Sequence, residues 1–249
     1  MSSRLRALLR RRPEIAALAV AGALFGAGAL NLALRRGGGE ATSPTAPLVT
    51  SSPDPRARVG PDPGEAVAAY IERKKQLLAD RASGQPRRTV HAVLSLPAYR
   101  RGVEAETLAA GLGLEVIAVL MRVPLPEQER VEARLSGSVS STVGEILRSR
   151  LLEAEEELAT LEAILPDVTD EPSRAVYIED IEAHRQLVGL LRSDPAVVFA
   201  LVVRSTHDSL ARAGAHPEVR LIDLPEDPGA TPSTHLFRGI LPEETERAG

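Results

Sequence analysis

The side chains best able to act as a base or a metal ligand are the five histidines, because the chain contains no cysteine. They are His91, His184, His207, His216 and His235. No two have the i, i+4 spacing with which one helix presents a pair of metal ligands. His207 and Asp208 open a predicted helix that Ser205 or Thr206 caps, so Asp208 is expected to stabilise the helix N-terminus. His184 falls on an apolar stripe and is expected to pack and hydrogen-bond to a neighbour; the alternative is a pH-sensitive element.

Motifs for nucleotide binding and nucleophilic catalysis are absent. The chain has no G-x-x-x-x-G-K-[ST], no G-x-S-x-G, and no G-x-G-x-x-G after a predicted strand. Gly111-Leu112-Gly113 precedes a predicted strand, which is typical of a helix C-terminal turn. The polar run 136–142 has no lysine nearby, so it predicts a weakened stretch of helix and no serine–lysine dyad. We therefore expect a protein without enzymatic activity, cofactor or metal ion.

A membrane anchor is predicted near the N-terminus. Residues 15–34 carry no charge and one polar side chain, Asn31, and a helix of that length spans about 30 Å, the thickness of a bilayer's hydrocarbon core. Five arginines precede this run within residues 1–14. The positive-inside rule therefore places residues 1–14 in the cytoplasm and the chain after the span outside. The alternative is a cleaved signal peptide, because Ala27-Gly28-Ala29 resembles a cleavage site.

Two glycines in the predicted span are candidate interaction residues. Gly22 and Gly26 form a G-x-x-x-G pair, which lets two membrane helices approach closely. The alternative is that both are small residues facing lipid. The pair predicts contact between two copies of the chain within the bilayer.

Composition separates the remainder into a tether, a domain and a tail. Residues 35–61 are rich in Gly, Ser, Thr and Pro, which predicts a disordered tether. Asp62 and Pro63 suit the N-cap and first position of a helix, so we expect an extracytoplasmic domain over residues 62–224. Its first helix should continue to about Arg81.

The last segment, residues 225–249, is predicted to be an irregular tail. It contains several prolines and one small apolar patch that includes Phe237. Such a patch either docks on the domain or serves as a recognition segment, so Phe237 is a further candidate interaction residue.

The domain is predicted to be α+β, with two β-α-β halves. Val90, Ala92, Leu94 and Leu96 alternate with more polar residues, which predicts a half-buried first strand. Two such halves pair into a four-stranded antiparallel sheet with helices on one face, the ferredoxin-like arrangement. The predicted elements are a strand at 89–96, a helix at 104–111 and a strand at 116–123, followed by a strand at 196–203, a helix at 205–213 and a strand at 219–224.

A long antiparallel helical hairpin is predicted as an insertion between the halves, at about 126–193. Apolar residues recur every three or four positions from Val131 to Leu165, which predicts one continuous helix ended by Pro166. Asp170 should cap a second, shorter helix that packs against the first as in a coiled coil. Part of the first helix therefore needs another partner, which is the sheet, the predicted helix that starts at Asp62 and continues to about Arg81, or a second chain. The candidate interaction residues on this helix are Leu147, Leu151, Leu158 and Leu161.

Charge is distributed unevenly along the chain. Residues 1–36 contain seven arginines and one glutamate, whereas the remainder carries 23 basic and 33 acidic residues. A domain with a net charge of −10 repels a phosphate backbone, so we expect no nucleic-acid partner. The basic end suits anionic lipid at the membrane surface.

These observations predict a single-pass protein of the cell membrane with an extracytoplasmic domain. The topology is similar to that of outer domains in pilus and secretion platforms, which implies a non-catalytic scaffold or assembly component that binds envelope proteins and forms a homodimer. SPOR (sporulation-related) domains share the strand and helix order, which implies peptidoglycan binding as an alternative. The helical insertion, the acidic charge and the lack of an aromatic platform depart from that family. A third hypothesis is an extracytoplasmic sensor that signals through a partner.

Overall fold

The structure is a computed structural model, and the residues that it describes are 57–125, 128–227, 229–231 and 233–246. The predicted membrane span 15–34, with Gly22 and Gly26, lies outside these ranges. Among the described helices, none combines the length and apolar character needed to cross a bilayer.

In chain order the elements are β1 (Ala57–Val59), α4 (Val67–Gly84), β2 (Thr89–Arg100), α5 (Gly102–Gly111), β3 (Glu115–Met121), β4 (Val131–Arg134), α6 (Val139–Ile164), η1 (Leu165–Asp167), α7 (Glu171–Arg192), β5 (Val198–Thr206), α8 (His207–Gly214), β6 (Leu221–Asp223) and β7 (His235–Phe237).

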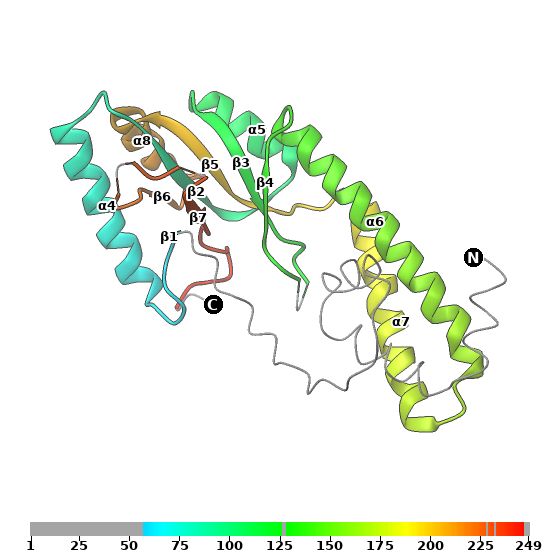
Figure 1. Cartoon of the computed structure of the whole chain (residues 1–249). Coiled ribbons are helices and arrows are strands. Elements are labelled where there is room, and N and C mark those ends of the chain that lie inside the picture. The colour runs from blue at the N-terminus through cyan, green and yellow to red at the C-terminus, as the bar shows by residue number, and fades with distance from the viewer. Residues whose placement is uncertain (1–56, 126–127, 228, 232, 247–249) are drawn as a thin grey trace, which may run out of the picture. The chain divides into compact units, whose positions relative to one another are not determined.

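The fold is α+β, built on a five-stranded antiparallel sheet with the order β4-β3-β5-β2-β6 (Figure 1). The central strand β5 pairs with β2 on one side, where Leu94 opposes Leu201, and with β3 on the other, where Val119 opposes the same residue. β6 extends the sheet beyond β2, and β4 extends it beyond β3. The four strands of the two predicted halves are all present, and β4 is an additional edge strand.

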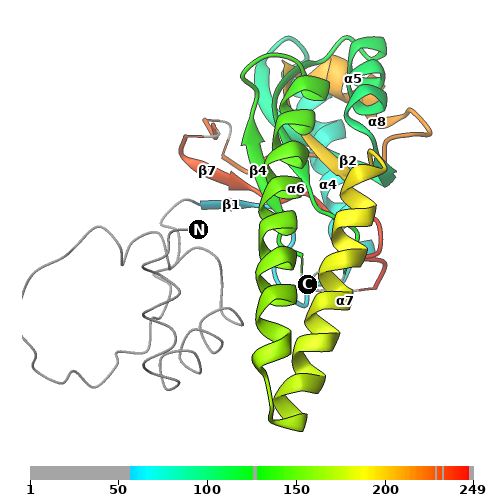
Figure 2. The same cartoon turned by 90° about the vertical axis from the view of Figure 1, so that its right-hand side faces the viewer.

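Helices α5 and α8 cover one face of the sheet (Figures 1 and 2). Ala105 and Ala109 of α5 and Leu210 of α8 are fully buried in one cluster with the inward side chains of β2, β3, β5 and β6. The first turns of α6 join this cluster beside α5. At that junction a side chain on Gly102 would lie 3.0 Å from the Cα of Ser140, so glycine permits the close approach of the two helices.

The opposite face of the sheet is covered by the chain's last described residues. β7 pairs in parallel with β1, and both lie on the side of the sheet away from α5 and α8 (Figures 1 and 2). Phe237 and Leu241 pack there against Phe199 and Val202 of β5. Gly239 has φ +63°, and a Cβ at this position would lie 2.9 Å from the Cβ of Ala200, so the tail runs directly over the sheet.

This second layer corrects the prediction of a half-buried first strand. Val93 and Ser95, which we expected on the solvent side, are fully buried. Ser95 accepts a hydrogen bond from the backbone N–H of Ile240 at 3.2 Å, so the tail supplies the partner that water would otherwise provide. The predicted tether and irregular tail, 35–61 and 225–249, therefore contribute strands and core residues to the same structure.

The start of the inserted hairpin also differs from the prediction. Val131 and Leu135 follow the helical spacing, yet Val131–Arg134 is strand β4, and the helix begins only at Val139. The side chain of Ser138 accepts a hydrogen bond from the N–H of Ser141 at 3.1 Å, which makes it the N-cap. The polar run that we interpreted as a weak point within a helix is the helix start.

The first helix of the domain begins later than expected. Asp62-Pro63-Gly64-Glu65 forms a hydrogen-bonded turn in which the N–H of Glu65 donates to the carbonyl of Asp62. Gly64 has φ +79°, outside the helical region, so α4 starts only at Val67. It ends at Gly84, three residues beyond the predicted Arg81.

The buried position of Phe237 gives the first testable prediction. Phe237→Ala should lower the free energy of unfolding by about 3 kcal/mol, because a buried aromatic side chain is lost and a cavity remains. Denaturant unfolding of the full chain measures this change. The control is Leu152→Ala, because Leu152 is 62% exposed and its truncation should change stability by less than about 0.5 kcal/mol. Equal effects of both substitutions would show that the tail does not contribute to the core.

Candidate functional site

The helical hairpin formed by α6 and α7 is the most distinctive surface of the described chain. Both helices have side-chain N-caps, Ser138 for α6 and Asp170 for α7, whose carboxylate accepts from the N–H of Ser173 at 3.0 Å. The predicted cap Asp170 is thereby confirmed. α7 packs mainly on α6, and Figure 2 shows the two helices side by side below the sheet.

The leucines predicted as interaction residues lie on the inner side of this hairpin. Leu147 is buried in the main core, and Leu151 and Leu158 pack against that core half-buried. Leu161 is likewise half-buried. The structure therefore gives these four residues a packing role between α6, α7 and the domain. Phe237, the candidate in the tail, is buried on the sheet.

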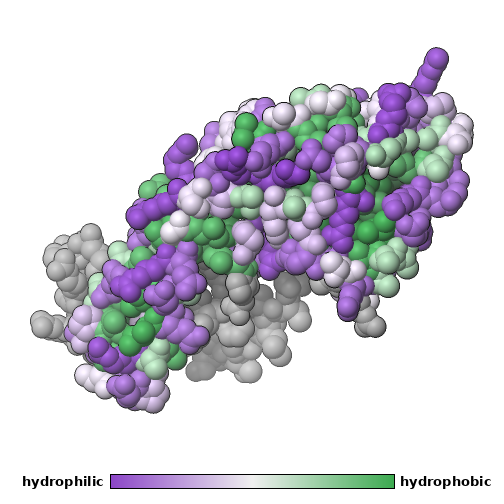
Figure 3. Space-filling view, turned by 180° about the vertical axis from the view of Figure 1, so that it is seen from behind, coloured by the Kyte–Doolittle hydropathy of each residue, from purple (hydrophilic) through white to green (hydrophobic). Residues whose placement is uncertain are grey.

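Other apolar side chains of the hairpin are exposed. Leu152 and Ile164 of α6 are 62% and 39% exposed, and Val176 and Ile178 of α7 are 44% and 50% exposed. At the lower left of Figure 3, the hairpin surface shows hydrophobic side chains among hydrophilic ones. The apolar periodicity of the sequence identifies the residues that the helices bury, so it did not identify these exposed residues.

Ion pairs connect the two helices of the hairpin. Arg185 contacts Glu162 at 2.8 Å, and Arg192 contacts Glu155 at 2.7 Å. His184 contacts the backbone carbonyl of Asp180 through Nδ1 at 2.8 Å and the carboxylate of Glu157 through Nε2 at 3.1 Å. The predicted role of His184, packed and hydrogen-bonded to a neighbour, is confirmed.

The first turn of α6 is joined to α5 by hydrogen bonds to the carboxylate of Glu106. Glu106 accepts hydrogen bonds from the hydroxyl of Ser140 at 2.6 Å and from its N–H at 3.0 Å. These bonds hold the pKa of Glu106 below its ordinary value, because they stabilise the charged form. The bond from the backbone N–H of Ser140 also satisfies a donor in the first turn of α6 that has no partner within the helix.

This contact gives a prediction about pH. Because the pKa of Glu106 is lower in the folded than in the unfolded chain, its stabilising effect is present above about pH 4.5 and is lost as pH falls through the folded pKa. Glu106→Gln should therefore lower the denaturant midpoint at about pH 7, and this effect should diminish as the pH falls below about 4.5. Ser140→Ala should lower the denaturant midpoint with the same dependence on pH. In this variant NMR should show a higher pKa of the Glu106 carboxyl, because the hydrogen bond from the hydroxyl is lost. A loss of stability that is equal at both pH values would contradict this role.

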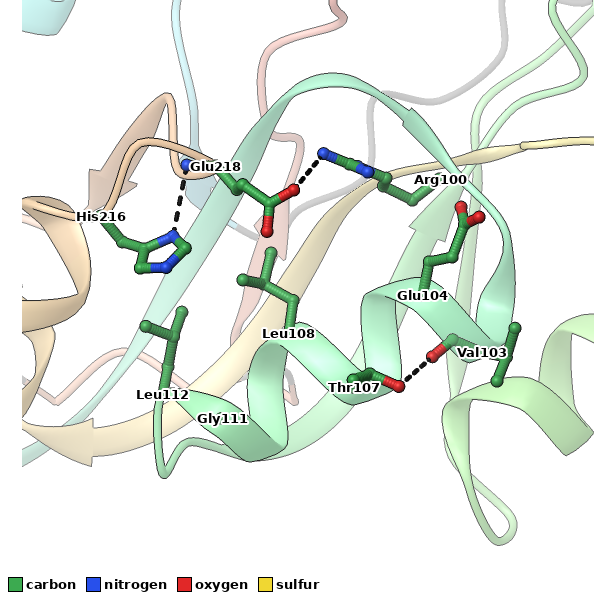
Figure 4. Close-up of a pocket in the computed structure, with 9 residues that line it drawn as sticks. All are labelled: Arg100, Val103, Glu104, Thr107, Leu108, Gly111, Leu112, His216 and Glu218. Carbon is green, nitrogen blue, oxygen red and sulfur yellow. Dashed lines mark hydrogen bonds and ion pairs between the residues drawn. The ribbon is translucent and has the colours of Figure 1, made fainter.

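A groove lies between α5 and the segment that connects α8 to β6 (Figure 4). Its volume is about 480 Å³, and its apolar lining includes Leu108 of α5 and Leu112, the C-cap of that helix. Arg100 and Glu218 stand at its rim and pair with each other at 2.5 Å. His216 accepts from the N–H of Glu218 at 3.2 Å. The groove thus has polar groups that already bind one another.

A buried charged cluster lies between α4 and β6. Lys74 contacts the carboxylate of Asp223 at 3.2 Å and donates to the carbonyl of Leu224 at 2.9 Å. Tyr70 donates its hydroxyl proton to the same carboxylate. Burial raises the pKa of Asp223 despite the opposing effect of Lys74, and burial together with Asp223 also raises the pKa of Tyr70. Lys74 lies on the apolar stripe of the predicted first helix, which is the only sequence signal of this cluster.

The two lysines of the chain provide a matched test of this cluster. Lys74→Met should lower the free energy of unfolding by about 3 kcal/mol or more, because it leaves the buried Asp223 without its counter-charge. Lys75→Met removes only an exposed pair with Glu72 and should cost less than about 1 kcal/mol. Denaturant unfolding of both variants measures the difference. Similar values for the two would show that Lys74 and Asp223 do not interact strongly.

The described residues contain no group of three or more His, Asp or Glu side chains placed to hold a metal ion. Comparison with protein families, with characterised proteins and with solved structures finds no match to this chain. The function must therefore be argued from the surface of the molecule itself.

Proposed function

We propose that this protein is a single-pass, membrane-anchored component of the cell envelope that binds other envelope proteins through the hairpin of α6 and α7. In this proposal the protein is a scaffold or assembly factor and not an enzyme. The bilayer is its partner through residues 15–34, and a homodimer is expected through Gly22 and Gly26.

The membrane part of the proposal rests on the sequence. An uncharged run of bilayer length follows five arginines, and the segment 35–61 is rich in Gly, Ser, Thr and Pro. Such an arrangement suits a domain held outside the membrane on a tether. The net charge of the chain after residue 36 suits a surface that binds proteins and repels nucleic acids.

We assign the domain to the ferredoxin-like arrangement with an inserted hairpin. The support is the order of the four strands β6-β2-β5-β3, each antiparallel to its neighbour, with α5 and α8 as the connections within the two halves. This arrangement hosts many functions, so it does not by itself favour one.

The observation that carries the proposal is the exposure of large apolar side chains on the hairpin. Ile164 of α6 and Val176 of α7 lie near the connection between the two helices and are 39% and 44% exposed. Exposed apolar side chains grouped on one element mark protein interaction sites more often than chemistry.

Site-specific photo-crosslinking in native membranes tests the proposal. The full chain with a photoreactive residue at Ile164 should form a discrete adduct with an envelope protein. The control is Arg212 of α8, whose side chain is 70% exposed on another part of the surface, and it should form no such adduct. Identical products from both positions would contradict a docking role of the hairpin. Sedimentation with purified peptidoglycan, without any adduct at Ile164, would favour a wall-binding module instead.

A further inference from the structure

The hairpin has two unlike sides. The pairs Arg185–Glu162 and Arg192–Glu155 bridge the helices along one side. At 3.6 residues per turn, positions nine apart lie about 180° apart on a helix. Val176 is nine residues before Arg185, and so it lies on the other side of α7.

The side without these bridges is here called the open side. On α6 the helical spacing places Glu153, Glu157 and Ile164 on it, because each lies about 160–200° from Glu155 or Glu162. On α7 it contains Val176 and the positions four, seven and eleven residues further along. Those three positions are Asp180, Ala183 and Leu187.

The open side combines apolar and acidic groups. Ile164 and Val176 are 39% and 44% exposed, and Leu187 is half-buried at its inner end. The side chains of Glu153 and Glu157 are 57% and 55% exposed, although Arg150 lies 3.4 Å from Glu153 and His184 of α7 lies 3.1 Å from Glu157. The apolar residues on one face of two antiparallel helices offer a surface on which the apolar face of a third helix can pack.

Charge decides which occupant this surface suits. Residues 153–186 contain eleven acidic residues and two arginines, a net charge of −9 with histidine neutral. Two copies joined through their hairpins would bring these like charges together, and an anionic bilayer or a nucleic acid would be repelled. A basic protein surface is attracted.

We propose that the open side binds a basic amphipathic helix of a partner protein, which completes a three-helix bundle. Its apolar face packs on Ile164, Val176 and Leu187, and its lysines or arginines face Glu157 and Asp180. Such helices present apolar anchors at i, i+3, i+4 and i+7. This inference rests on the proposed docking role of the hairpin and specifies the chemistry of the partner.

A pair of synthetic peptides tests this inference with the full chain. One peptide is an amphipathic helix of about 20 residues, roughly 30 Å long, with leucine on one face and lysine on the other. The second has glutamate at every lysine position. Isothermal titration should show binding of the basic peptide, weakening with salt, and at least about tenfold weaker binding of the acidic one. Equal binding of the two peptides, or none by the basic one, would overturn the inference.

Two substitutions on α7 locate the binding surface. Val176→Asp on the open side should weaken binding of the basic peptide at least about tenfold. Ile178→Asp is the matched control, because Ile178 is 50% exposed but lies on the ion-paired side with Arg185, and it should change binding less than about twofold. The double variant Glu157→Lys with Asp180→Lys should weaken binding of the basic peptide, because it changes the net charge of residues 153–186 from −9 to −5. Equal effects of Val176→Asp and Ile178→Asp would overturn the assignment to the open side.

Failure of this inference is distinguishable from failure of the proposed function. A crosslinked envelope protein at Ile164 together with no binding of the basic peptide would retain the docking role and reject the basic helix. Adducts at Ile164 between two copies of this chain would also reject it. Binding of the basic peptide that Val176→Asp abolishes, with a crosslinked partner whose contact region is a basic helix, would support both.

Discussion

The fold depends on the burial of β5 on both of its faces. Every residue from Val198 to Val203 is fully buried, so neither face of the sheet's centre contacts water. An antiparallel sheet usually leaves one face solvated, and strands buried on both faces need a layer on each side. The helices α5 and α8 supply one layer. The other is supplied by β1, β7 and the tail, so residues from both ends of the described chain complete the core.

Hydrogen bonds and ion pairs of charged side chains fix the position of the tail on the sheet, because they are directional and apolar packing is not. Arg220 donates to the carbonyl of Leu241 at 2.7 Å, and Arg122 pairs with Glu243 at 2.6 Å. Tyr99 donates to the same carboxylate, and burial with the nearby charge of Glu243 raises the pKa of Tyr99 to about 12. The tail is therefore an integral part of the fold, held by Arg122, which follows β3, and by Arg220, which precedes β6.

The sequence predicts the elements that have strong periodicity. It does not predict burial that depends on residues far away in the chain. The β-α-β order, the hairpin and the cap Asp170 follow from local patterns, and all three are present. The burial of Val93 and Ser95 could not be read locally, because it depends on a tail more than 140 residues later. The strand at Val131 was mistaken for helix because a three-or-four-residue spacing continues across Ser136-Gly137-Ser138, and periodicity alone does not register such a break.

The leucines predicted as interaction residues lie on the side of α6 that the domain and α7 cover. A periodic apolar stripe identifies the residues that a helix buries. Leu147 and Leu158 belong to this stripe, and they pack against the domain core. Residues available to a partner lie outside that stripe. Val176 and Ile178 flank it on α7, and only the three-dimensional arrangement of the ion pairs separates the two flanks. Lys74 shows the same limit, because a lysine on an apolar stripe signals a buried partner but not that the partner is Asp223.

The acidic surface and the exposed apolar residues of the hairpin are best understood together. Large apolar side chains at the end of a projecting element favour association between copies. A net charge of −9 on the same segment opposes that association at short range, because like charges on facing surfaces repel. The repulsion disappears when the incoming helix is basic. In our proposal, these side chains therefore oppose self-association of the hairpin and favour a basic partner helix.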